Sequence, residues 1–402
     1  MNKSLYVVIF LFTINSSFGQ SIVKTMKNLP DTGENVSYTA TNGEDNDYMI
    51  NPPFFLLNGN GIVTDTMTGL MWAQADGGEM TFERALNYCD TLTLGGYTNW
   101  RLPLPHEAFS IQNMQHSNPS LDLSVFTTTA AEYWWTSVRQ INDTTKIWVT
   151  NAGGGIGNHP KSETISAGGT KKFHTRAVRD ITNPSIILAH FTDNTNGTIT
   201  DNVTGLIWQK DHSSDSLTWE QALGYADTLS WNGSNDWRLP NIKEIESIND
   251  ENMVNPSVNA TYFPDLTNKK VWSSTTLPNQ TTKAWYLQTQ FGITTYDSKI
   301  RKDYVLCVRG NNLIATKIDS ENDNLPSINL FPNPSQNFLT LITNEPLKSV
   351  HIFNLLGEQE LFEQPTTNNQ QLSINVSTLK AGVYFVEVET KKGVVRKKLL
   401  KN

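Results

Sequence analysis

The sequence predicts an α+β protein in which two tandem domains are followed by a small C-terminal antiparallel β-sandwich. Three observations support this prediction. A long segment of the chain occurs twice, the last part alternates apolar and polar residues in short runs, and 402 residues suffice for two or three domains.

The chain opens with a pattern typical of a secretory signal peptide. A single lysine precedes an apolar run from Leu5 to Ile14, and small residues follow up to Gly19. Such a run is too short to span a bilayer, which takes about 20 apolar residues. We expect residues 1–19 to be removed by cleavage between Gly19 and Gln20, and we expect no transmembrane helix farther along.

The repeated segment indicates a duplicated domain. The stretch TGLMW at 68–72 returns as TGLIW at 204–208, and WRLP at 100–103 returns at 237–240. Trp237 follows Trp100 by 137 positions, and this offset aligns most of the two copies. A period this long is typical of whole domains rather than of a solenoid of short units.

The tryptophans show where the cores are expected. All eleven lie between Trp72 and Trp285. Large indole groups usually anchor cores or contact surfaces. We therefore place copy one within residues 20–185, where an N-terminal extension precedes it, and copy two within residues 186–310.

Each copy is predicted to begin with a hairpin. Asn60-Gly61 and Asn196-Gly197 are typical of type I′ turns, because both residues of such a turn adopt positive φ. In copy one, short strands are expected at 62–64 and 70–72.

Two helices are predicted next in each copy. Thr81 is the expected N-cap in copy one, and Thr218 with Gln221 predicts a capping box in copy two. A second short helix is expected near Pro105 and, in copy two, at Asn241. Further strands of copy one are expected at 133–135, 147–149 and 176–179.

The last part of the chain is predicted to be a separate β-sandwich at residues 328–402. Apolar residues alternate there in four short runs, at 339–341, 350–352, 372–376 and 383–388. Residues 311–327 are polar and acidic, which predicts a linker.

The two copies resemble the C-terminal domain family of bacterial collagen-like adhesins. The resemblance covers most of residues 55–310, and its motifs are TGLMW, ALxYC at 85–89, WRLP, WTS at 135–137 and the closing Val178-Arg179, with the same set in copy two. It implies a C-type-lectin-like fold and a role in surface adhesion and glycan contact.

The tail resembles the type A C-terminal sorting domain of the type IX secretion system. The matching motifs are FPNP at 331–334, IFNLLG at 352–357, LKAGVY at 379–384 and the basic KKLL at 397–400. The resemblance implies a Gram-negative outer-membrane route in which residues 328–402 bind the secretion machinery. The protein would then be secreted or attached to the outer-membrane surface.

The two cysteines, Cys89 and Cys307, allow two interpretations. In the family pattern, a cysteine on the first helix is usually matched by one just before the closing Val-Arg, and each copy here has kept a different half. Two separate buried thiols are one interpretation. The other is a Cys89–Cys307 disulfide with closing strands exchanged between the copies, which an exported protein permits.

The sequence predicts no catalytic residue, no metal ligand and no cofactor. It contains no metalloprotease, nucleophile-elbow or phosphate-loop motif. Glu107 and Glu244 are the best paired carboxylates, but each lies in the first turn of a predicted helix, where it stabilises the N-terminus. Calcium held by loop carboxylates is kept as an alternative.

The predicted function is a non-enzymatic adhesin or glycan-binding protein. The aromatic residues Trp134, Trp231 and Tyr296 are the expected ligand contacts, and two copies would give bivalent binding. A net charge of −8 argues against nucleic acid, whereas glycans or proteins of host or neighbouring surfaces are compatible partners. The alternatives are a secreted hydrolase or sulfatase-maturation-like enzyme on a related fold, and a structural surface-layer component.

Overall fold

The computed structural model describes most of the chain. The described residues are 22–127, 132–161, 173–181, 183–310, 314–315, 328–331, 335–343, 345–354, 358–365, 370–391 and 393–401. The predicted cleavage site at Gly19 and Gln20 lies outside them. The chain divides into two compact units, residues 1–317 and 318–402, and each is described by itself. None of the helices in the described ranges has the length and apolar character of a membrane span.

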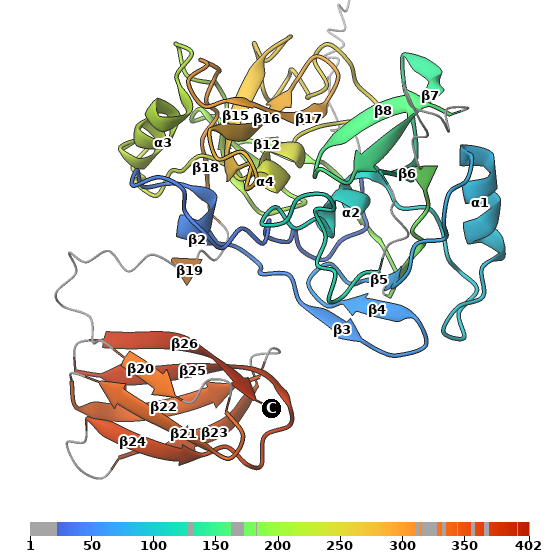
Figure 1. Cartoon of the computed structure of the whole chain (residues 1–402). Coiled ribbons are helices and arrows are strands. Elements are labelled where there is room, and N and C mark those ends of the chain that lie inside the picture. The colour runs from blue at the N-terminus through green and yellow to red at the C-terminus, as the bar shows by residue number, and fades with distance from the viewer. Residues whose placement is uncertain are drawn as a thin grey trace, which may run out of the picture. The chain divides into compact units, whose positions relative to one another are not determined.

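The first unit contains both copies and consists mainly of short strands (Figure 1). Copy one and the segment before it contain β1 (Ile22–Lys24), η1 (Asp45–Asp47), β2 (Tyr48–Met49), β3 (Phe55–Leu57), β4 (Ile62–Asp65), β5 (Leu70–Ala73), α1 (Phe82–Thr91), α2 (Pro105–Ser110), β6 (Tyr133–Gln140), β7 (Asp143–Asn151), β8 (Ile156–Pro160), β9 (Phe173–His174) and β10 (Val178–Asp180). Copy two and the residues after it contain β11 (Ser185–Ile187), β12 (Phe191–Asp193), β13 (Thr198–Asp201), β14 (Ile207–Gln209), α3 (Trp219–Asp227), α4 (Ile242–Glu246), β15 (Lys270–Thr276), β16 (Lys283–Gln288), β17 (Ile293–Ser298), β18 (Val308–Arg309) and β19 (Ile314–Ala315). The predicted combination of antiparallel sheets and short helices is confirmed, and the C-type-lectin-like fold stays a prediction.

Each copy closes a small sheet with its own last strand. In copy one the order is β10-β5-β4-β3, and Val178 pairs with Trp72. In copy two the order is β12-β13-β14-β18, and Val308 pairs with Trp208. Trp72 and Trp208 are fully buried, so the repeated Gly-Leu-x-Trp motif gives each sheet its central tryptophan.

The predicted hairpin turn is found in copy one only. Asn60 and Gly61 have φ angles of 55° and 74°, as a type I′ turn requires. In copy two the positive φ angles belong to Thr195 and Gly197 instead. The side chain of Asn196 accepts hydrogen bonds from the backbone and hydroxyl of Thr198, which gives this turn a different conformation.

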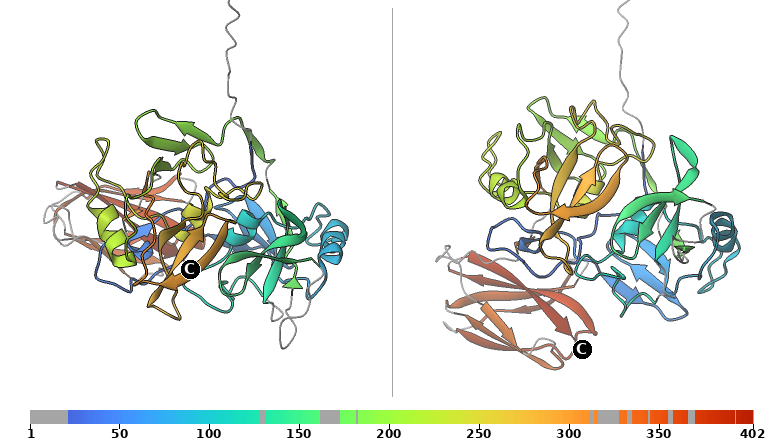
Figure 2. Two further views of the ribbon diagram at one scale, coloured as in Figure 1. Left: turned by 90° about the horizontal axis from the view of Figure 1, so that it is seen from above. Right: turned by 45° about the horizontal axis from the view of Figure 1, so that its top comes forward.

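One sheet runs through both copies. Its order is β15-β16-β17-β8-β7-β6-β9, and the copies meet where Ile156 pairs with Thr294. The N–H of Ile156 also donates to the hydroxyl of Thr294 at 2.8 Å. Phe109 and Trp148 of copy one share a hydrophobic core with Trp285 of copy two. The right panel of Figure 2 shows the two halves of the sheet side by side, so the copies are joined by both sheet and core.

The helices begin where the sequence predicts. α2 begins at Pro105, and α4 follows Asn241. The side chain of Thr218 accepts the N–H of Gln221, whose own side chain accepts the N–H of Thr218, so the capping box of α3 is confirmed. Thr81 occupies the N-cap position of α1, but its side chain makes no capping bond.

The segment before copy one crosses copy two. We call residues 31–50 the strap. It contains η1 and β2, and β2 pairs with β19, so that Met49 lies opposite Ile314. Figure 1 shows the strap in blue beside α3 and β18 of copy two. The N-terminal extension thus packs against the copy that is more distant in the sequence.

The second unit is a two-sheet sandwich, as predicted. One sheet has the order β20-β21-β24, and the other β23-β22-β25-β26. The strands are β20 (Ile328–Phe331), β21 (Phe338–Thr343), β22 (Leu347–Phe353), β23 (Gln359–Glu363), β24 (Gln371–Asn375), β25 (Gly382–Thr390) and β26 (Gly393–Lys401). Leu339, Val350 and Val386 are among the residues of its core. Each of the four predicted strands overlaps a strand of this unit.

Candidate ligand-binding site

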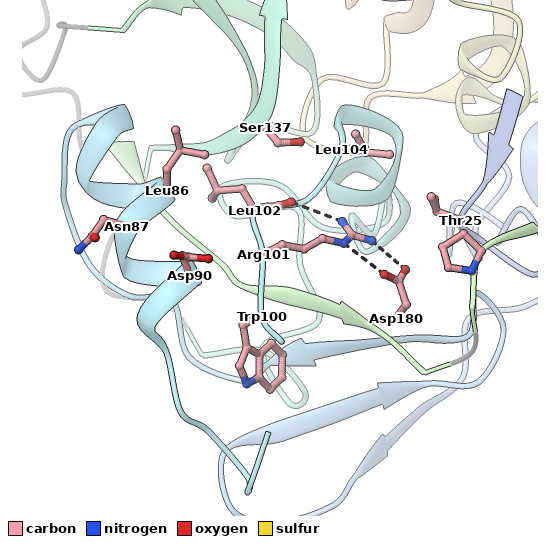
Figure 3. Close-up of a pocket in the computed structure, with 11 residues that line it drawn as sticks. Thr25, Leu86, Asn87, Asp90, Trp100, Arg101, Leu102, Leu104, Ser137 and Asp180 are labelled. Carbon is pink, nitrogen blue, oxygen red and sulfur yellow. Dashed lines mark hydrogen bonds and ion pairs between the residues drawn. The ribbon is translucent and has the colours of Figure 1, made fainter. Parts of the chain in front are cut away.

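A pocket of about 540 Å³ opens on copy one beside the WRLP motif (Figure 3). Its lining comprises Leu86, Asn87 and Asp90 of α1, Trp100, Arg101 and Leu102 of the motif, Ser137 of β6, Asp180 of β10, and Thr25, Leu104 and Pro184. The first helix, the repeated motif and the closing strand therefore converge on one cavity. Its wall combines apolar side chains with carboxylate, amide, guanidinium and hydroxyl groups.

Two carboxylates hold Arg101 at the wall of the pocket. Its Nη atoms donate to Glu107 at 2.7 and 2.8 Å, and Nε and Nη2 donate to Asp180 at 3.3 and 2.8 Å. Glu107 is buried and also accepts the N–H of Leu104. Burial raises the pKa of Glu107, but the hydrogen bonds and charge of Arg101 outweigh burial and hold the pKa below its ordinary value. Glu107 therefore serves as an ionised anchor for Arg101.

Copy two repeats this ion pair at a buried position. Arg238 donates to the two oxygens of Glu244 at 2.5 and 2.6 Å. The Arg101 side chain is 33% exposed and the Arg238 side chain only 2%. Leu86 is 38% exposed, whereas its counterpart Leu223 is fully buried. The same surface is thus open in copy one and closed in copy two.

The strap closes the copy-two surface. The ring centre of Tyr48 lies 5.7 Å from Cζ of Arg238. Gly43 packs against Leu223 with a φ of 101°, a conformation that favours glycine. An aromatic ring and a glycine of the strap therefore cover the two copy-two residues whose counterparts are exposed in copy one.

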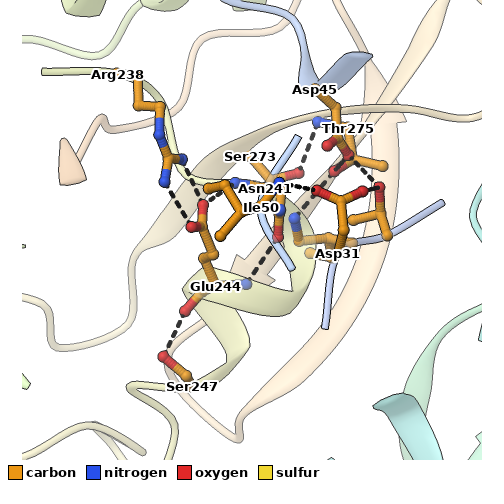
Figure 4. Close-up of polar contacts among 11 residues, drawn as sticks. Asp31, Asp45, Ile50, Arg238, Asn241, Glu244, Ser247, Ser273 and Thr275 are labelled. Atoms are coloured by element: carbon orange, nitrogen blue, oxygen red, sulfur yellow. Dashed lines mark hydrogen bonds and ion pairs between the residues drawn. The ribbon is translucent and has the colours of Figure 1, made fainter. Parts of the chain in front are cut away.

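Hydroxyl–carboxyl bonds fix the strap to β15, and Figure 4 shows the one between Thr275 and Asp45. Thr275 donates to Asp45 at 2.5 Å, and Thr276 donates to Glu44 at 2.5 Å. Burial raises the pKa of Asp45 well above its ordinary value, and it raises the pKa of Glu44 as well. Lys299 donates to the Thr276 hydroxyl at 2.8 Å and completes the contact.

A buried lysine joins the strap to both copies. The Nζ of Lys243 donates to the carbonyl oxygens of Asp31 in the strap and Ser110 in copy one, each at 2.8 Å. Burial lowers the pKa of Lys243 to about 8. The strap is therefore an integral part of the first unit.

None of the three predicted aromatic contacts lines the pocket. Trp134 is only 5% exposed and belongs to a core cluster, so the expectation of a surface contact there is wrong. Trp231 is half-buried, lies against Gly197 and occupies the position of Leu94 in copy one. Tyr296 is exposed and meets Trp285 edge-on with ring centres 5.2 Å apart.

The structure does not join Cys89 to Cys307. Both thiols are free and buried, and they lie in separate core clusters. Because β10 and β18 each pair within their own copy, no strand exchange brings the sulfurs together. Burial raises the pKa of Cys89 to about 11 and raises that of Cys307 as well, so neither thiol is poised as a nucleophile.

The paired carboxylates are structural. Glu107 and Glu244 are both held by arginines and accept the backbone N–H that begins their helices, as the sequence predicts for residues at a helix N-terminus. The buried pair of His174 and Asp76, 3.1 Å apart, lies outside the pocket. Within the described ranges, no group of three or more His, Cys, Asp or Glu side chains is placed to hold a metal.

Sequence reasoning alone misses the pocket, because its polar residues come from segments far apart in the sequence, namely Thr25, α1, the WRLP motif, β6 and β10. Trp100 is buried, as expected for a core residue, but Arg101 reaches the cavity. One signal is present in the sequence. The closing Val-Arg is followed by Asp180 in copy one and by Gly310 in copy two, and Asp180 is one of the two carboxylates on Arg101.

Comparisons with known proteins agree with the duplicated architecture. Residues 61–179 and 197–309 match the family described as the Lcl C-terminal domain. Residues 329–402 match the secretion system C-terminal sorting domain, which implies delivery to the cell surface by the type IX machinery. No curated protein matches the chain.

One solved structure, the dimeric latent PorU from Porphyromonas gingivalis, is 12% identical and aligns with 63% of this chain and 26% of its own. The chain thus spans about a quarter of that protein, and the TM-score of 0.15 carries no argument about the fold.

Proposed function

Because the chain belongs to the Lcl C-terminal domain family, we propose that it is a non-enzymatic adhesin that binds glycans at the cell surface. The open pocket of copy one is the proposed contact site. The sorting domain supports this proposal, because it delivers the pocket to the surface where such ligands occur.

The chemistry of the pocket is the observation that carries the glycan proposal. Sugar hydroxyls both donate and accept hydrogen bonds, and the C–H faces of sugar rings are apolar. Asn87 offers a donor and an acceptor, Asp90 offers acceptors, and Leu86 and Leu102 supply apolar surface. Arg101 is already oriented by its carboxylates, so ligand binding does not have to order it.

In this proposal the contact site lies in copy one, so each chain binds through that copy and not through both. Among the described residues, the copy-two counterpart of this surface is covered by the strap, which buries Arg238. Strong attachment would then come from many chains displayed on one surface.

The non-enzymatic part of the proposal is supported by how the titratable groups are used. The two best carboxylates are held by arginines, and both thiols are buried with raised pKa values. A secreted hydrolase or sulfatase-maturation-like enzyme would need a convergent acid–base set or a reactive cysteine. No observation favours that alternative or a purely structural surface-layer role.

A glycan-array screen of the chain without its signal peptide tests the proposal, with calcium and again with chelator. The double variant Asn87→Ala/Asp90→Asn should lose at least about tenfold in affinity for any glycan that binds. Asp227→Asn is the matched control, because Asp227 is the exposed counterpart of Asp90 in copy two. Absence of binding to every glycan, or equal loss in the control, would contradict the proposal. Binding that is lost only in the presence of chelator would show that the site requires calcium.

A further inference from the structure

The strap shows how this surface of the fold accepts a polypeptide. Across the copy-two counterpart of the pocket, Gly43 lies on Leu223, and Tyr48 lies over Arg238 with an extended backbone at φ −131° and ψ 121°. β2, which begins at Tyr48, pairs with β19. In copy two, the surface that corresponds to the pocket is thus covered by a segment of the same chain.

The copy-one pocket keeps the two residues on which the strap lies. Leu86 aligns with Leu223, and Arg101 aligns with Arg238, each 137 positions earlier. Leu86 is 38% exposed, and the Arg101 side chain is 33% exposed. In copy one, Leu86 and Arg101 line an open cavity instead.

The strand beside the pocket differs between the copies in a way that selects the occupant. Thr276, which donates to Glu44, is replaced in copy one by Arg139, an exposed cation. Thr275, which donates to Asp45, is replaced by Val138, which has no side-chain donor. Copy one can therefore pair an acidic group at the first of these positions but offers no partner for a carboxylate at the second.

We propose that the copy-one pocket receives an extended segment of a partner protein that follows the pattern Gly, acidic, apolar, two variable residues, aromatic. The glycine lies on Leu86, the acidic residue pairs with Arg139, and the aromatic ring lies over Arg101. The apolar residue lies beside Val138, which is half-buried against a hydrophobic core cluster next to the pocket. This assignment goes beyond the glycan proposal, because it gives the pocket a polypeptide ligand.

The partner differs from the chain's own strap. The strap carries Asp45 where copy one presents Val138, and two carboxylates, Asp90 and Asp180, line the copy-one pocket. The strap of a second molecule is also buried against that molecule's own copy two. The matching segment therefore belongs to another protein and carries fewer acidic residues.

A synthetic peptide tests this inference directly. Its sequence is that of residues 39–52 with the single change Asp45→Val, and it carries a fluorescent label. Binding to the full chain without its signal peptide is followed by fluorescence polarisation. Because the chain's own strap fills copy two, saturable binding reports on copy one. We expect a dissociation constant of about 10–100 μM, typical of a short unconstrained segment.

Two variants of the chain locate the binding site. Leu86→Lys, in the pocket, should weaken peptide binding by at least about tenfold. Leu57→Lys should leave binding unchanged, because Leu57 is a 55% exposed leucine on β3 and does not line the pocket. A peptide with Tyr48→Ala should bind at least about tenfold more weakly as well.

Three outcomes would overturn the inference: no saturable binding, binding unaffected by Leu86→Lys, or equal loss with Leu57→Lys. Circular dichroism of both variants separates loss of the pocket from loss of the fold. The glycan array is independent of this measurement, so a chain that binds glycans but no peptide keeps the proposed function and loses this inference.

Discussion

The same arginine–glutamate pair occurs twice in this chain, and burial is what separates the two occurrences. Arg238 and Glu244 are each 2% exposed at the side chain, and Glu244 is the only carboxylate within ion-pair distance of Arg238 among the described residues. Arg101 is a third exposed and has Asp180 as a second partner. Removing the glutamate therefore leaves an uncompensated buried cation in copy two only.

We expect Glu244→Gln to lower the free energy of unfolding by about 3–5 kcal/mol, as for other broken buried pairs. Glu107→Gln should have a clearly smaller effect, because solvent and Asp180 still compensate Arg101. Urea unfolding followed by tryptophan fluorescence measures both. Equal losses would show that the difference in burial does not control the energy of the pair.

The two cysteines give a second prediction at the scale of single residues. Cys89 and Cys307 are buried free thiols with raised pKa values. Without reductant, the folded protein should react with a thiol reagent at neither site, and the unfolded protein should react at two. Fewer than two reactive thiols after unfolding would reinstate the disulfide.

At the scale of elements, α1 and α3 begin at matching threonines that differ in their hydrogen bonds. Thr218→Ala removes a capping box and should destabilise the unit by about 1 kcal/mol. Thr81→Ala should cost less, because the Thr81 side chain makes no capping bond. Thermal unfolding of the two variants compares them, and a larger loss for Thr81→Ala would contradict the observed caps.

Local patterns account for the elements that the sequence predicts correctly. The capping box at Thr218, the start of α2 at Pro105 and the strands of the sandwich depend on residues close together in the sequence. The side-chain burial of Trp134 depends on tertiary packing instead. The aromatic character of a residue does not by itself separate a core residue such as Trp134 from an exposed one such as Tyr296.

The arrangement of the site could not be predicted for the same reason. The bond from Ile156 to Thr294 joins residues 138 positions apart, and the bond from Thr275 to Asp45 joins residues 230 apart. The strap has no apolar periodicity that would identify its partner. Hydroxyl–carboxyl bonds, the Lys243 bond to Asp31, the pairing of β2 with β19, one glycine and one ring hold it. Only the tertiary structure shows that one of the two repeated surfaces is covered.

For the whole first unit, the strap predicts a dependence on pH. Burial, together with the charges of Asp45 and Glu44, raises the pKa of Glu34 well above its ordinary value. Such a group contributes its full stability below its ordinary pKa, and the contribution is lost as the pH rises through the folded-state value. The free energy of unfolding of the first unit should therefore fall as the pH rises from acidic to mildly alkaline, because Glu34 ionises in its buried position.

Glu34→Gln isolates this effect, because the neutral amide cannot ionise. Between pH 5 and pH 9, the free energy of unfolding of the variant should rise relative to that of the wild type by at least about 1 kcal/mol. Asp211→Asn, at an exposed carboxylate, serves as the control. A difference that stays constant with pH would show that Glu34 is ionised in the folded protein.

The shared sheet and core predict that the two copies unfold together. Cys89 reports on copy one and Cys307 on copy two. In pulsed thiol labelling at increasing urea, both should become reactive at the same concentration. Labelling of one cysteine at clearly lower urea would mean that the copies are independent domains, despite the pairing of Ile156 with Thr294.

The covered surface of copy two also limits which amino-acid substitutions the chain can accept during evolution. A substitution at Tyr48, Arg238 or Thr275 disturbs a buried contact, so these positions are expected to change only together. Asn87 and Asp90 face a cavity and can be replaced one at a time. Descendants of this gene can therefore acquire new recognition in one half of the duplication while the other half is inherited almost unaltered.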